Sequence, residues 1–135
     1  MRPRISEELG LLRSAFGEVD HAEDAGNDWF RLTCYLFPAG WTGDGEAIEH
    51  AAILFNANAA YPTGDPYGFW TPAGVLFNGQ PPKDVTEVGN PVFEGQWTQF
   101  SWAPDETWRP GSTVESGSNL TDWARSFAKR LAEGV

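Results

Sequence analysis

The chain has 135 residues, of which 41% are hydrophobic and 21% charged, and this length and composition are typical of one folded domain over residues 1–135. Its formal net charge at pH 7 is -10. Proteins that bind nucleic acids or anionic membranes usually carry clusters of Lys and Arg, so this negative net charge argues against both as partners. It fits a basic or apolar partner, or an acidic surface that only aids solubility.

The single cysteine, Cys34, cannot form an intrachain disulfide. The start of the chain shows no basic region followed by an apolar run and a cleavage site. No apolar stretch approaches the ~20 residues that a membrane span needs. We therefore expect a cytoplasmic protein, in a compartment where thiols stay reduced.

The first predicted element is an amphipathic helix over residues 4–16. Its candidate N-cap is Ser6, and Gly17 is the candidate end. The apolar side chains that recur at helical spacing are Ile5, Leu9, Leu12 and Phe16. The acidic stretch 18–28 follows, and its turn-forming residues 25–28 predict a hairpin with a solvated edge.

Two strands are predicted next, over residues 29–37 and 48–57. In the first of them Cys34 falls on the more apolar side of the alternating pattern, so we expect a buried thiol. Residues 59–110 are rich in Gly and Pro, and within them the periodicity predicts a strand only over 74–77. The many aromatic side chains of this stretch predict an ordered loop region rather than disorder.

The last predicted element is a helix over residues 118–133. Ser118 or Thr121 is its candidate N-cap, and Gly134 is a natural end. Its apolar stripe consists of Leu120, Trp123, Phe127 and Leu131. The predicted fold class is therefore α+β, with an antiparallel sheet of about four strands flanked by the N-terminal helix (4–16) and this C-terminal helix.

Three short motifs, in this order, resemble those of ubiquitin-conjugating domains: Tyr61-Pro62, Pro66 and Trp108-Arg109-Pro110. In that family a strand ends in a Tyr-Pro pair, a second proline follows and leads into another strand, and a Trp with a nearby Pro lies just beyond the catalytic loop. Phe69-Trp70 stands where that further strand is expected. The resemblance covers roughly residues 4 to 133 and implies the ubiquitin-conjugating-enzyme fold. The aromatic run 93–102 is similar to a divergent bacterial branch encoded beside ubiquitin-like proteins and activating enzymes.

The resemblance also implies a catalytic cysteine shortly before Trp108, and this chain has none there. Ser101 lies closest to that place and is the candidate acyl carrier, as an oxyester, with Thr98 as the second hydroxyl. A hydroxyl needs a base, and the nearest carboxylates in sequence are Asp105 and Glu106, while both histidines lie far away. The alternatives are a loop serine that bonds the local backbone, or an engineered replacement of a cysteine.

An asparagine stabilises the oxyanion in the family. Asn90 is the closest candidate for that role, with Asn78 behind it, although the His-Pro-Asn motif of the family is absent. A turn asparagine is the competing interpretation, because Asn before Pro favours turns.

Two functions follow from the resemblance. In the first, the chain accepts the C-terminus of a ubiquitin-like protein from an activating enzyme and passes it to a target protein that the sequence does not name. In the second, it is an inactive ubiquitin-conjugating enzyme variant that binds a ubiquitin-like protein or the activating enzyme as a scaffold. A third hypothesis is unrelated to ubiquitin and uses Trp70, Trp97 or Trp102 as a platform for sugars or peptides. No metal or cofactor is expected, because no cluster has metal-ligand spacing and no phosphate-binding loop is present.

Overall fold

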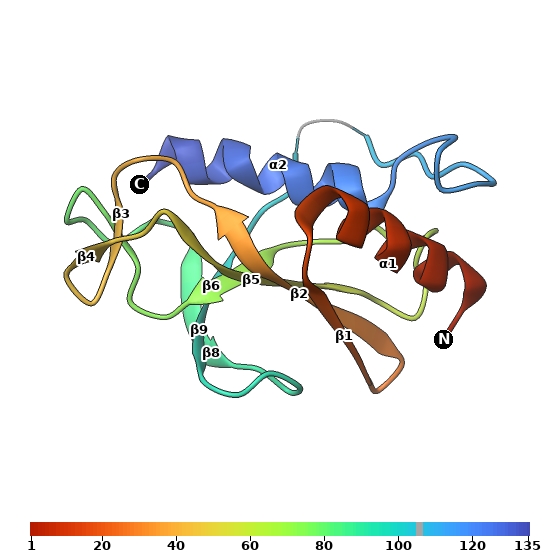
Figure 1. The fold of residues 1–135 in the computed structure, drawn as a ribbon, viewed down its shortest axis with the longest axis horizontal. Coiled ribbons are helices and arrows are strands. Elements are labelled where there is room, and N and C mark those ends of the chain that lie inside the picture. Colours follow the sequence, from red (N-terminus) through yellow and green to blue (C-terminus); the bar gives the residue numbers. More distant parts are fainter. Residues whose placement is uncertain (105–106) are drawn as a thin grey trace.

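The computed structural model describes residues 1–104 and 107–135 and consists of a twisted sheet with both helices on one face (Figure 1). The chain begins with helix α1 and ends with helix α2, and all strands lie between them. The elements in chain order are α1 (Pro3–Phe16), β1 (Val19–Asp24), β2 (Asn27–Leu36), β3 (Trp41–Gly43), β4 (Glu46–Ala47), β5 (His50–Ala57), β6 (Phe69–Pro72), β7 (Leu76–Phe77), β8 (Val85–Gly89), β9 (Gln96–Phe100) and α2 (Leu120–Glu133). Neither of these helices has the length and hydropathy that a membrane crossing requires.

The main sheet has six strands in the order β1-β2-β5-β6-β9-β8, and every pair is antiparallel. A small second sheet has the order β4-β3-β7. The predicted α+β class with an antiparallel sheet and two flanking helices is confirmed, but the main sheet exceeds the expected four strands. The additional strands β8 and β9 come from the stretch that the sequence pattern predicted as a loop region. They are five residues each, and β9 is held between β6 and β8.

The aromatic residues build two clusters, one on each face of the sheet. The cluster beneath the helices stacks Phe69 against Phe127 of α2, with 4.4 Å between ring centroids. The cluster on the opposite face contains Trp29, Leu54, Trp70, Phe93 and Trp97. Adjacent residues of a strand point to opposite faces, which explains why Phe69 and Trp70 belong to different clusters. Because Trp70 and Trp97 are buried and Trp102 is half-buried, the Trp-platform hypothesis loses the exposed rings that it needs.

A bulge in β2 exposes Cys34, so the prediction of a buried thiol is wrong. The register between β2 and β5 shifts between Leu32 and Tyr35, because one extra residue is inserted on the β2 side. Before the bulge the even-numbered Leu32 faces the helices, and after it the odd-numbered Tyr35 does. Cys34 and Leu36 are therefore turned to solvent.

The helix boundaries agree with the predicted ranges to within two residues, but the caps differ. Helix α1 has Arg2 at its N-cap position without a side-chain cap, so Ser6 is not its cap. Helix α2 is capped by Asn119, whose Oδ1 accepts a hydrogen bond from the Asp122 N–H at 2.9 Å, in place of the predicted Ser118 or Thr121. Gly17 and Gly134 end the two helices as predicted.

Candidate functional site

Ser101 follows directly after β9, and its side chain is exposed, as an acyl carrier would require. Its backbone N–H donates to Asp84 O at 3.0 Å, which continues the β8–β9 ladder by one residue. Among the described residues, its Oγ makes no hydrogen bond to another side chain or to the backbone. The hydroxyl therefore has no partner there that would remove its proton.

The other two predicted site residues are not brought to Ser101. Thr98 is only 1% exposed, and its Oγ1 donates to Glu87 at 2.6 Å, so this hydroxyl is already used within the β8–β9 pair. Asn90 lies at the Gly89 end of the hairpin, whereas Ser101 lies beyond the Phe100 end. Five residues of strand separate these two ends by about 15 Å.

Asn90 has a turn role instead. Its Oδ1 accepts hydrogen bonds from the N–H groups of Val92 and Phe93, both at 3.0 Å, which fixes the connection between β8 and β9. Asn78 lies in the turn after β7, and its N–H donates to Gly40 O at 2.8 Å. Neither asparagine is placed to stabilise an oxyanion at Ser101.

Among the described residues, the candidate bases give no catalytic pair with Ser101. Asp105 and Glu106 lie outside the described residues. His21 is on β1, which three strands separate from β9, a distance of about 19 Å. His50 begins β5, two strands away from β9.

The residues that carry the family resemblance meet at one junction. The indole N–H of Trp108 donates to Pro62 O at 2.8 Å, and the Trp108 and Tyr61 rings are 5.7 Å apart. The Tyr61 hydroxyl donates to the fully buried carboxylate of Glu8 from α1. Burial first, and then the Glu8 carboxylate, raise the pKa of Tyr61 well above its ordinary value.

Glu8 also connects this junction to α2. Its Oε1 accepts the N–H of Leu120, the first residue of that helix, at 3.0 Å, and Arg4 lies 3.4 Å from its Oε2. A carboxylate at a helix N-terminus is favoured by the helix dipole. Tyr61 and Trp108 are therefore scaffold residues that hold the segment before α2 against the rest of the fold.

That segment and α2 enclose an open groove of about 410 Å³. Trp108 and Trp123 supply its aromatic surface, and Asp122, Arg125 and Lys129 supply its charged rim. Asp122 lies 3.5 Å from Arg125, both of them more than half exposed, and Lys129 has no ion-pair partner among the described residues. The groove begins at Pro104, three residues beyond Ser101, and Ser101 does not line it.

Comparison of the chain with protein-family models, with curated proteins and with solved structures found no match. The groove residues Asp122, Arg125 and Lys129 are ones that sequence reasoning did not select. The sequence shows that these three residues recur at helical spacing along one side of the predicted C-terminal helix. It does not show which segment of the chain packs opposite them.

Proposed function

We propose that this chain is a binding module, related in layout to inactive ubiquitin-conjugating enzyme variants, that holds the extended C-terminal segment of a ubiquitin-like protein in the groove beside α2. The groove carries the proposal, because it combines an aromatic surface with a rim whose described residues include two cations, Arg125 and Lys129, beside the carboxylate of Asp122. In a chain with net charge -10, such a rim favours an acidic group, and the carboxylate of a chain terminus is one.

A buried donor in the groove wall adds support. Trp123 lines the groove, and its buried Nε1 has no hydrogen-bond partner among the described residues. An unsatisfied buried donor costs about 1–3 kcal/mol. A backbone carbonyl of a bound segment that reaches this nitrogen would satisfy it.

Binding is favoured over acyl transfer because the described residues place no group beside Ser101 that would activate its hydroxyl. Among the described residues nothing bonds its Oγ, and Asn90 lies at the other end of the hairpin. The partner class comes from the resemblance of Tyr61-Pro62 and Trp108-Arg109-Pro110 to ubiquitin-conjugating domains.

The test measures binding of a ubiquitin-like protein with an intact C-terminal segment by isothermal titration calorimetry. Arg125→Glu and Lys129→Glu should each weaken binding by about tenfold, the effect of losing roughly 1.4 kcal/mol. Lys83→Glu is the matched control, since it makes the same change of charge at an exposed residue that does not line the groove. Equal loss in all three variants, or in none, would contradict a groove site.

Acyl transfer is the second candidate, and the exposure of Ser101 is the observation that favours it. Incubation with an activating enzyme, ATP and the ubiquitin-like protein that it activates distinguishes the two. A binding module yields no covalent adduct, and Ser101→Ala binds as the unaltered chain does. An adduct that resists thiol reductants, yields to hydroxylamine and disappears in Ser101→Ala would instead establish the oxyester carrier.

A further inference from the structure

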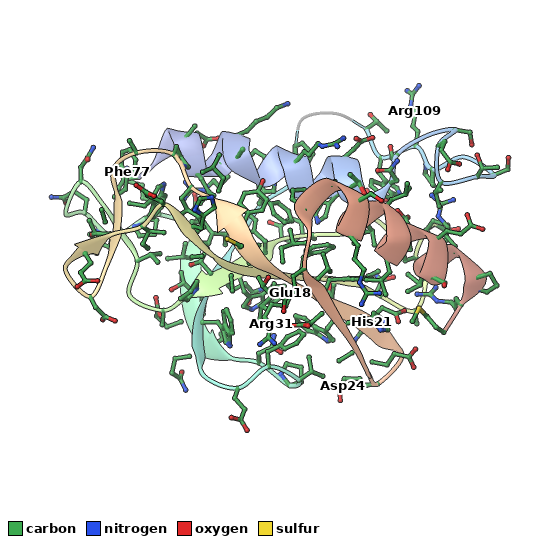
Figure 2. The ribbon with its side chains drawn as sticks, in the orientation of Figure 1. Glu18, His21, Asp24, Arg31, Phe77 and Arg109 are labelled. Carbon is green, nitrogen blue, oxygen red and sulfur yellow. The ribbon has the colours of Figure 1, made fainter. Side chains whose placement is uncertain are left out.

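The β1–β2 hairpin brings one histidine and two carboxylates together at the edge of the sheet. His21 and Glu23 are two residues apart on β1 and so point to the same face, and Asp28 of β2 pairs directly with Glu23. One ligand atom of each of these three side chains lies within 4.8 Å of the others. Figure 2 shows His21 on this hairpin, with Asp24 at its tip. The three residues are called the hairpin triad below.

Two members of the triad are held in place below the surface. His21 Nε2 lies 2.8 Å from Asp28 Oδ1, and the two side chains are 10% and 6% exposed. The ring of His21 packs on Phe30, with 5.2 Å between centroids. Glu23 is 58% exposed, and its Oε1 lies 3.9 Å from the N-terminal ammonium group of Met1, so it would turn from that exposed ion pair to join the other two ligands.

The second oxygen of Asp28 has a different partner. Arg2 donates to Asp28 Oδ2 at 3.0 Å, and the same guanidinium reaches the carbonyls of Asn58, Ala59 and Tyr61. Arg2 therefore fixes the orientation of the Asp28 carboxylate and directs Oδ1 towards His21. In metal sites, residues of this kind orient the ligand carboxylate from outside the coordination sphere.

An open cavity of about 280 Å³ adjoins the triad and is lined in part by Glu23 and Asp28. The buried side chains of His21 and Asp28 and this cavity are two separate features of the structure. Together they provide ligands that are already positioned, and space from which water molecules can complete a coordination shell.

We propose that the hairpin triad binds a first-row divalent metal ion of the zinc class. The imidazole nitrogen favours such an ion over Mg²⁺ and Ca²⁺, which prefer oxygen ligands alone. Metal–ligand distances of about 2.0–2.2 Å would place the ion between His21 Nε2 and Asp28 Oδ1, which need to separate by only a few tenths of an ångström. The Arg2 guanidinium and the N-terminal ammonium group of Met1 balance the charges of Asp28 and Glu23, so the proposal depends on the ligand types and their positions and not on an excess of negative charge.

The site shares no lining residue with the groove beside α2, so the two proposals stand or fall separately. Its test uses the full chain, stripped of metal, and Zn²⁺ alone in isothermal titration calorimetry. We expect one Zn²⁺ per chain. His21→Gln and Glu23→Gln should each weaken binding by about tenfold or more.

Two controls make the result specific. His50→Gln removes the second of the two histidines, which is exposed on β5, and it should bind Zn²⁺ as the unaltered chain does. Glu23→Gln changes an exposed side chain and so tests the site even where His21→Gln disturbs the hairpin. Co²⁺ absorption in the visible region, present in the unaltered chain and lost in Glu23→Gln, gives a second readout.

Absence of Zn²⁺ binding, or binding that survives both triad variants, would overturn the proposal. The contacts among Arg2, Asp28 and His21 would then be a structural clamp between the N-terminus and the hairpin. Loss of Zn²⁺ binding in His50→Gln would overturn the proposal as well, since that result would place the metal site at His50 and not at the hairpin triad.

Discussion

The Cys34 thiol should react rapidly with thiol reagents in the native protein, because the β2 bulge turns it to solvent. Reaction with a chromogenic disulfide should proceed at a rate close to that of the chain unfolded in denaturant. Cys34→Ser removes the only thiol and supplies the blank. Slow labelling that accelerates on unfolding would instead mean that the thiol is shielded.

Single residues differ in how far sequence alone predicts their surroundings. The exposure of Ser101 was predictable, because a small polar side chain in a stretch predicted as a loop region usually lies at the surface. Cys34 was not, because its environment depends on a bulge, and a one-residue shift exchanges the two faces of a strand. The partners of Thr98 and Asn90 could not be predicted either, since both act within a hairpin that the sequence pattern did not reveal.

Among the elements, α2 depends on its Asn119 cap, and Asn119→Ala should destabilise the protein by about 1 kcal/mol. Asn119→Asp keeps an oxygen for the Asp122 N–H but loses the hydrogen bond from Asn119 Nδ2 to Val114 O. The aspartate variant should therefore lie between the alanine variant and the unaltered chain. Urea unfolding measures all three, and equal stability of the three would exclude a capping role.

The helices and the first hairpin were predictable because their signals are local. The apolar stripes of α1 and α2 and the turn at Ala25-Gly26 each lie within one stretch of sequence. Strands β8 and β9 were missed because they are short and bounded by Gly and Pro. Strand β9 is held by pairing with β6, which is distant in sequence, and β8 in turn pairs with β9, so neither pairing gives a local signal. The groove was missed because residues 107–119, which contribute to its wall opposite α2, form no helix or strand and so leave no periodic pattern in the sequence.

At the scale of the whole molecule, stability should fall between pH 10 and pH 12. Tyr35 is 6% exposed, and burial raises its pKa to about 12. In the unfolded chain a tyrosine titrates near pH 10, so in this interval the folded state binds more protons. The free energy of unfolding therefore decreases as pH rises, by about 2 kcal/mol for this residue.

Tyr35→Phe isolates that contribution. The variant should be less stable at neutral pH by about 1 kcal/mol, because it loses the hydrogen bond from the hydroxyl to Ala124 O. Its free energy of unfolding should also decrease less between pH 10 and pH 12 than that of the unaltered chain. Tyr61 contributes to the pH dependence of both proteins. Identical pH profiles from denaturant titrations would contradict the assignment to Tyr35.

The carboxylate of Glu8 has a consequence for synthesis on the ribosome. It is fully buried, yet its partners Tyr61 and Leu120 emerge 53 and 112 residues later. Until Leu120 has left the exit tunnel, burying Glu8 would leave a charge without one of its donors, which costs several kcal/mol. Helix α1 is therefore expected to stay undocked on the nascent chain and to join the sheet only when the last helix arrives.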